Sequence, residues 1–143
     1  MKTQKIKPVF VEFIPEQIDE GVLYISERYR TATHKCCCGC GKKVVTPFSP
    51  VKWTLIKGHG VVSLRPSIGN WSYECQSHYF ITNNQVVWAG QFSPKQIKKV
   101  QQRDKQDNKN YIEQLNAQHR AKKFGWFGKM FTDFLNWIKS TIK

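Results

Sequence analysis

The chain has 143 residues, which is enough for one domain with appendages. Its formal net charge of +13 lies mainly in its last part, because residues 1–90 carry eleven Lys or Arg against six Asp or Glu and residues 91–143 carry twelve against four. No apolar run of about 7–15 residues follows the basic start, so the sequence predicts no secretory signal. Its cysteines form no disulfide framework, which predicts a reducing, cytoplasmic compartment.

Strand-like segments cover most of the chain up to residue 90, because β-branched and aromatic residues are frequent there. The predicted strands are residues 8–14, 21–26, 42–46, 51–56, 61–65, 77–82 and 85–89. Two pairs of them read as hairpins, joined by residues 57–60 and by Asn83-Asn84, since Asn tolerates the positive φ of a two-residue turn. The predicted fold class is therefore mostly β (α+β): a small antiparallel β domain with a C-terminal helical extension.

The last third of the chain changes to a helical pattern. Ser93 is a predicted N-cap, with Pro94 in the first turn and Gln96 three residues after the cap. Residues 94–122 carry few apolar positions and predict a poorly buried helix. Residues 124–142 predict a separate amphipathic helix, whose apolar face carries Phe127, Phe131, Phe134, Ile138 and Ile142, with Met130 and Trp137 beside it. The predicted domains are residues 1–92, a zinc-containing β domain, and the basic tail 93–143.

The cysteines indicate a metal site. Cys36-Cys37-Cys38-Gly39-Cys40 crowds four thiols into one turn, and Cys75 stands alone. Alternate residues of extended chain share a face, so Cys36, Cys38 and Cys40 can converge while Cys37 points away, with Cys75 as the fourth ligand. Four thiolates suit tetrahedral Zn²⁺ and leave no open position, which predicts a structural ion. The alternatives are a histidine ligand (His34 or His78), buried inert thiols, or redox-active cysteines.

A serine and a histidine form the second candidate site. Ser67 lies between Pro66 and Gly69, which predict a sharp turn at a strand end, and His78 follows eleven residues later. A serine nucleophile requires a base within hydrogen-bonding reach, and His78 is a candidate for it. Asn70 is a candidate for donating to an oxyanion or for orienting His78. Ordinary turn chemistry and a buried core histidine are the alternative interpretation.

Other polar residues support weaker hypotheses. His34 and Glu12 are further candidates for a site. A metallopeptidase would need an open zinc position and a carboxylate such as Glu74, and the chain has no His-Glu-x-x-His stretch. A Cys37 nucleophile paired with His34 would compete with metal binding.

Three motifs in register resemble a small bacterial family of peptidases, formerly a domain of unknown function. The motifs are HKCCCGCG (residues 34–41), SLRPSIGNW (residues 63–71) and CQSHYFI (residues 75–81). The family is encoded in ubiquitination-like (Bub-type) operons beside a ubiquitin-like protein and its activating and conjugating enzymes. The resemblance spans about residues 8–90 and leaves the tail uncovered.

This resemblance implies a serine-type, zinc-stabilised peptidase that processes the precursor of the ubiquitin-like protein or removes it from conjugates. Carried over to this chain, Ser67 is the nucleophile, His78 its base, and Cys36, Cys38, Cys40 and Cys75 hold the metal. The family has cysteines at alternate positions, so Cys37 is additional. The resemblance assigns no third member of the catalytic triad.

Other functions compete with the peptidase. A non-catalytic zinc module could bind nucleic acid through the basic tail, with steeply salt-dependent affinity. However, charge alone identifies no partner, and an adaptor could bind the ubiquitin-like protein without cutting it. The aromatic helix 124–142 also suits a membrane surface, although its internal charges and length argue against a span. The alternative is that its apolar face packs on its own core, a second copy or a conjugation enzyme.

Overall fold

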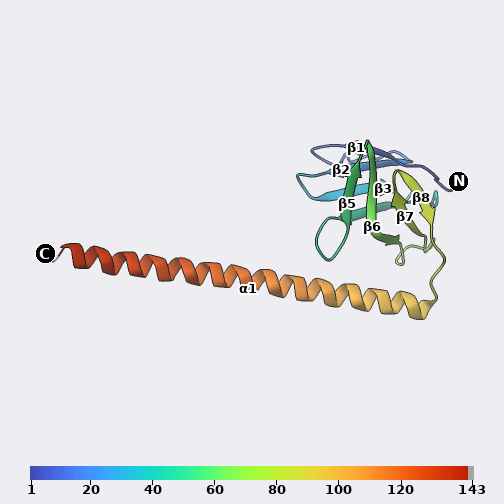
Figure 1. The fold of residues 1–143 in the computed structure, drawn as a ribbon. Helices are drawn as coiled ribbons and strands as arrows, with labels where there is room; N and C mark the ends of the chain where they lie inside the picture. Colours follow the sequence, from blue (N-terminus) through green and yellow to red (C-terminus); the bar gives the residue numbers. More distant parts are fainter. Residues whose placement is uncertain (142–143) are drawn as a thin grey trace. The chain divides into compact units, whose positions relative to one another are not determined.

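The computed structural model describes residues 1–141, with side chains described for residues 1–122, Met130 and Trp137. Within this range the chain forms eight strands followed by one helix (Figure 1). The strands are β1 (Lys7–Phe10), β2 (Val22–Ser26), β3 (Thr31–Lys35), β4 (Lys43–Pro47), β5 (Thr54–Gly58), β6 (Val61–Gly69), β7 (His78–Thr82) and β8 (Gln85–Trp88), and the helix is α1 (Pro94–Thr141). The predicted fold class, mostly β with a C-terminal helix, is confirmed.

The strands form two four-stranded sheets, ordered β1-β2-β3-β4 and β5-β6-β7-β8. A single apolar cluster draws on both sheets, so the core lies between them. Its fully buried members include Leu23, Ile25, Leu64, Ile68, Tyr79 and Ile81. Burying these side chains contributes roughly 1.5–3 kcal/mol each, which makes the core the main support of every residue on the strands.

Two isolated bridges join the edges of the sheets. Lys5, just before β1, pairs with Gln85 of β8, and Phe48, just after β4, pairs with Trp53, just before β5. The two sheets therefore approach a closed barrel, held at each seam by a single bridge.

Both predicted hairpins are confirmed. His59 and Gly60 join β5 to β6, and Asn83 and Asn84 join β7 to β8, with all four residues at positive φ. This is the backbone that a two-residue turn between twisted strands requires.

Three expectations about the strands are wrong. First, β1 ends at Phe10 and runs parallel to β2, because residues 11–21 return the chain to the same end of the sheet. Second, β3 was not predicted; its buried positions Ala32, Thr33 and His34 are small or polar, and such residues do not stand out as a strand. Third, β6 continues past residue 65 through Pro66 to Gly69, so Ser67 lies within a strand and not on a turn.

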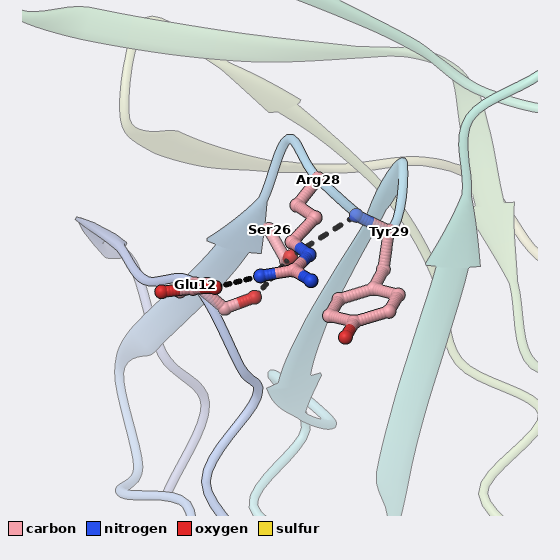
Figure 2. Close-up of polar contacts among 4 residues, drawn as sticks. All are labelled: Glu12, Ser26, Arg28 and Tyr29. Carbon is pink, nitrogen blue, oxygen red and sulfur yellow. Dashed lines mark hydrogen bonds and ion pairs between the residues drawn. The ribbon is translucent and has the colours of Figure 1, made fainter.

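A polar network fastens the loop after β1 to the turn after β2. Ser26 Oγ donates to the Glu12 carbonyl at 2.7 Å and accepts from the Tyr29 backbone N–H at 3.3 Å. The Glu12 carboxylate pairs with the Arg28 guanidinium, which also lies over the Phe13 and Tyr29 rings. Figure 2 shows Arg28 reaching across from the turn to Glu12. Glu12 therefore makes surface contacts that hold this loop to the turn.

The helix begins as predicted. Ser93 Oγ accepts from the Gln96 N–H at 3.4 Å, and the Gln96 side chain accepts from the Ser93 N–H at 2.8 Å, which is a reciprocal capping box. The expected weak burial is also confirmed, since Ile97, Val100 and Leu115 are half-buried and Ile112 is 50% exposed.

The helix also departs from prediction, because α1 runs without a break from Pro94 to Thr141 and so joins the two segments predicted as separate helices. By contacts, the chain divides into two units, Met1–Lys99 and Val100–Lys143. The expected packing of the apolar face of residues 124–142 lies outside the described side chains. Among the described residues, no helix has the length and apolar character that crossing a membrane would require.

Candidate active site and metal centre

Ser67 and His78 meet on the second sheet. Their side chains come from neighbouring strands, β6 and β7, and Ser67 Oγ lies 3.0 Å from His78 Nε2. His78 is 6% exposed, whereas Ser67 is half-buried. The distance is a normal hydrogen bond and lies within the reach that a general base needs.

The second nitrogen of His78 defines its tautomer. Nδ1 lies 2.9 Å from the carbonyl oxygen of Gly90, just beyond β8. A carbonyl can only accept, so Nδ1 carries the proton in the neutral ring and Nε2 is left to accept from the Ser67 hydroxyl. The backbone of His78 also holds the residues just after β8, because the Ala89 N–H donates to the His78 carbonyl at 3.0 Å. The imidazole is thus oriented by a main-chain oxygen, and Asn70 does not perform this role.

Aromatic rings enclose the imidazole. Phe92 lies edge-on to His78 at 4.6 Å between ring centroids, Trp71 lies at 5.0 Å, and the Trp71 and Phe92 rings stack at 5.2 Å. A Cβ at Gly69 would come within 2.3 Å of the Trp71 indole, so only glycine leaves room for that ring. These contacts limit the rotamers of His78 and shield one side of it from water.

An irregularity in β6 brings Ser67 to its position. Leu64 pairs with Ile81 but Ile68 pairs with Tyr79, so β6 uses two more residues than β7 over this stretch. Arg65 bridges the irregularity: it donates to the carbonyls of Leu64 and Ile81 at 2.9 and 3.1 Å. The bulge bends β6 and changes the direction in which its side chains point, as bulges beside functional sites do. It replaces the sharp turn that Pro66 and Gly69 predicted.

Cys36, Cys38, Cys40 and Cys75 form a second cluster, here called the cysteine corner, to which the segment between β6 and β7 contributes Cys75. The sulfurs of Cys36, Cys38, Cys40 and Cys75 all lie within 4.8 Å of one another. Three separations are 3.4, 3.9 and 3.8 Å (Cys36–Cys38, Cys36–Cys75 and Cys40–Cys75). Ligands about 2.3 Å from a tetrahedral zinc stand about 3.8 Å apart, so the donor set fits a metal ion. Among the described residues, no histidine belongs to this group.

Neutral polar groups surround these sulfurs. Asn70 Nδ2 donates to Ser77 Oγ at 2.8 Å, which leaves the Ser77 hydroxyl hydrogen free for Cys36 Sγ at 3.0 Å. Burial opposes ionisation of Cys75, but the backbone N–H and hydroxyl of Ser77, with the neighbouring thiols, outweigh it and lower its pKa to about 7. Hydrogen bonds of this kind orient and support thiolate ligands. Asn70 therefore belongs to the cysteine corner.

Cys37 and His34 point into the core instead. Cys37 is 1% exposed, and burial raises the pKa of its thiol to about 12. His34 is fully buried with Nε2 2.8 Å from the Tyr79 hydroxyl, and burial lowers the pKa of its imidazole to about 4. Neither residue forms a nucleophile–base pair with the other in the described contacts, and both support the packing under the cysteine corner. Glu74, the other carboxylate considered, is exposed.

A comparison with protein families identifies the chain. The model of the BubE family, bacterial ubiquitination-like system serine protease, matches residues 10–89, more than half of the chain. The chain belongs to this family. No curated protein and no solved structure matches it. BubE membership confirms the resemblance seen in the three motifs, and the matched residues include Ser67, His78 and all five cysteines.

Sequence reasoning missed three contributors to this BubE site. The Gly90 carbonyl carries no side-chain signal, because any residue can present a main-chain oxygen. Phe92 sits just before the helix cap, and Ser77 just before His78, where both read as ordinary connecting residues. Only the hairpin β7–β8 and the return of the chain past His78 bring them into contact.

Proposed function

We propose that this BubE protein is a serine-type peptidase that processes the precursor of a bacterial ubiquitin-like protein and removes that protein from conjugates. The observation that carries the proposal is the relay from Ser67 Oγ to His78 Nε2 and from His78 Nδ1 to the Gly90 carbonyl. The family supplies the serine protease class and the ubiquitination-like setting. Ser67 is the proposed nucleophile and His78 the proposed base.

In the proposed reaction, Ser67 Oγ attacks the carbonyl carbon of the scissile amide while its proton passes to His78 Nε2. The imidazolium then gives this proton to the departing amine, and an acyl-enzyme ester remains on Ser67. Water attacks the ester, His78 takes the water's proton, and returning it to Ser67 Oγ frees the carboxylic acid product. The Gly90 carbonyl holds the imidazole in the required tautomer throughout, which is the part that a carboxylate plays in the usual triad.

Cys36, Cys38, Cys40 and Cys75 would hold a zinc ion in this proposal. A closed set of four thiolates supplies folding free energy and no reactive water. The corner would act on catalysis only by holding the segment from Asn70 to His78 in place. Free thiolates of this kind require a reducing compartment, which favours the cytoplasm.

The test is cleavage of the ubiquitin-like precursor from the same system by purified protein. We expect Ser67→Ala and His78→Ala each to lower kcat/KM by at least about a thousandfold while leaving zinc content unchanged. Ser63→Ala is the matched control, because it removes a hydrogen-bonded hydroxyl from the same strand, and its activity should be retained. Cleavage unaffected by Ser67→Ala but lost at once on chelation would refute the proposal and move the chemistry to the metal. Tight binding of the precursor without cleavage would indicate an adaptor that binds the ubiquitin-like protein.

A further inference from the structure

One side of β6 is open beside Ser67. On one side β7 pairs with β6 at Leu64 and, after the irregularity, at Ile68 and Gly69, which lies opposite His78. On the other side the pairing with β5 stops at Arg65, which lies opposite Thr54. The four residues from Pro66 to Gly69 therefore have a neighbouring strand on one side only.

The main-chain groups of Gly69 face this open side. The Asn70 N–H donates to the Ser77 carbonyl on the β7 side, and Ile68 pairs with Tyr79 in the same register. Backbone direction alternates along a strand, so Gly69, between these two residues, points the other way. Its N–H and C=O therefore face the side on which the pairing with β5 has already ended, and Ser67 lies two residues before it on β6.

A second open edge lies on β4. The Cys36 N–H donates to the Lys42 carbonyl and the Phe48 N–H to the Arg30 carbonyl, so even-numbered residues of this strand face β3. The odd-numbered residues face outward. Two of them are capped: the Lys43 carbonyl accepts from the Tyr73 hydroxyl at 2.5 Å, and the Pro47 carbonyl accepts from the Trp53 N–H at 3.2 Å.

Val45 lies between these two caps, and its N–H and C=O have no backbone partner among residues 1–141. Its side chain is 51% exposed. The outer edge of β4 is thus occupied at Lys43 and Pro47 and free between them at Val45. Only a short segment could pair with it.

Val45 of β4 and Gly69 of β6 line the same cavity. It has a volume of about 190 Å³, with Trp53 and Tyr73, the residues of the two caps, also in its wall. The lining residues are Val44, Val45, Trp53, Ile68, Gly69, Asn70, Trp71, Ser72 and Tyr73. Ser67 lies two residues before Gly69, outside this lining. His78 is the register partner of Gly69 and contacts Ser67, so the reactive pair stands next to the Gly69 side of the cavity.

We propose that this cavity, here called the strand slot, receives an extended segment of the protein substrate, which pairs with Val45 on one side and with Ser67 and Gly69 on the other. The inference rests on the proposed peptidase function and names how its substrate binds. An extended polypeptide is the ligand whose N–H and C=O groups alternate to match such edges. The slot accommodates a short strand of about three residues, the span from Ser67 to Gly69, which is too short for a second copy of this chain to add an edge strand. The pairing would place the scissile carbonyl beside Ser67, with the Ser67 N–H available to the developing oxyanion.

The first test measures binding without cleavage. Amide hydrogen exchange of the Ser67→Ala protein is followed by NMR with and without the ubiquitin-like precursor. We expect exchange of the residue 45, 67 and 69 amides to slow at least about tenfold, because hydrogen-bonded amides exchange only after opening. The amide of residue 56, at an exposed position of β5 outside the cavity lining, serves as the internal control. Binding without protection of the three slot amides would overturn the inference.

The second test uses cleavage. Val45→Pro removes the outward N–H, and proline is tolerated where an edge N–H faces away from the sheet. We expect Val45→Pro to raise KM about tenfold, and Val45→Ala, which keeps the N–H and loses only side-chain contacts, to raise KM less than Val45→Pro does. Circular dichroism verifies folding. If Val45→Pro does not fold, peptides spanning the cut, N-methylated at one amide at a time, provide the equivalent test, with sensitive and insensitive positions alternating.

The outcomes separate the two proposals. Cleavage that needs Ser67 but ignores Val45→Pro and shows no alternation leaves the peptidase in place and refutes the strand slot. Absence of cleavage refutes the peptidase, and the exchange measurement on Ser67→Ala still decides whether an extended segment binds the slot.

Discussion

The cysteine corner and the serine–histidine pair share one connecting segment but depend on different kinds of information. Cys75 and Ser77 face the corner, whereas His78 contacts the serine and Trp71 packs on His78. In the corner, side chains of fixed chemistry converge through a tight local turn. At the serine, positions are set by a bulge, a main-chain carbonyl and two stacked rings. In the proposed function the corner is the anchor and the serine the reactive group, so damage to the first should reach the second but not the reverse.

The largest effect should follow loss of the corner. Cys38→Ser removes one of four ligands, and a site worth on the order of 10 kcal/mol decides whether a domain of this size folds. We expect no cooperative thermal unfolding and less than one equivalent of zinc per chain, measured by circular dichroism and metal analysis. Cys37→Ala, a neighbouring thiol turned into the core, should keep one zinc and a cooperative transition. Equal unfolding temperatures for Cys38→Ser and wild type would break the assignment of the corner as anchor.

A smaller effect should come from Gly69, on the serine side. Gly69→Ala places a Cβ against the Trp71 indole and should cost about 1–3 kcal/mol, because overpacked rings must shift. In a Trp71→Ala background the same substitution should cost almost nothing. A double-mutant cycle by chemical denaturation measures this coupling. Zinc content should stay at one equivalent in all four proteins, and additive costs would show that the ring is not held against the strand.

Phe92→Ala tests whether the rings around His78 act on the serine site separately from the cysteine corner. It removes the edge contact with His78 and the stack on Trp71, so we expect kcat/KM to fall about tenfold, or about 1.4 kcal/mol in the barrier. Phe92→Tyr keeps both ring contacts and should retain activity. The readouts are precursor cleavage and zinc content. A loss of zinc in step with activity would mean that Phe92 supports the whole domain and not the histidine.

The smallest effect should come from Arg28, which belongs to neither site. Its side chain and that of Glu12 are more than half exposed (60% and 57%), and exposed ion pairs contribute under about 1 kcal/mol. Arg28→Ala should therefore change neither zinc content nor cleavage, and its unfolding free energy should move by less than about 1 kcal/mol. A loss of activity would place the loop in Figure 2 within the substrate-binding surface.

The sequence by itself determined the features that depend on local chemistry. Alternate cysteines in a glycine turn have few geometric solutions, Asn83-Asn84 suits a positive-φ turn, and Ser93 with Gln96 forms a capping box. The three motifs also carried the family, since they combine residue type with spacing. These features survive in any fold that places the segments close together.

Only the tertiary structure decided the rest, because it depends on pairing between distant segments. The parallel course of β1, the two-residue irregularity in β6 and the orientation of His78 by the Gly90 carbonyl arise from strand register. The open edges at Val45 and Gly69 follow from where the neighbouring strands stop. Main-chain groups are the same in every residue, so no sequence pattern can reveal which of them remain unpaired until the sheets are assembled.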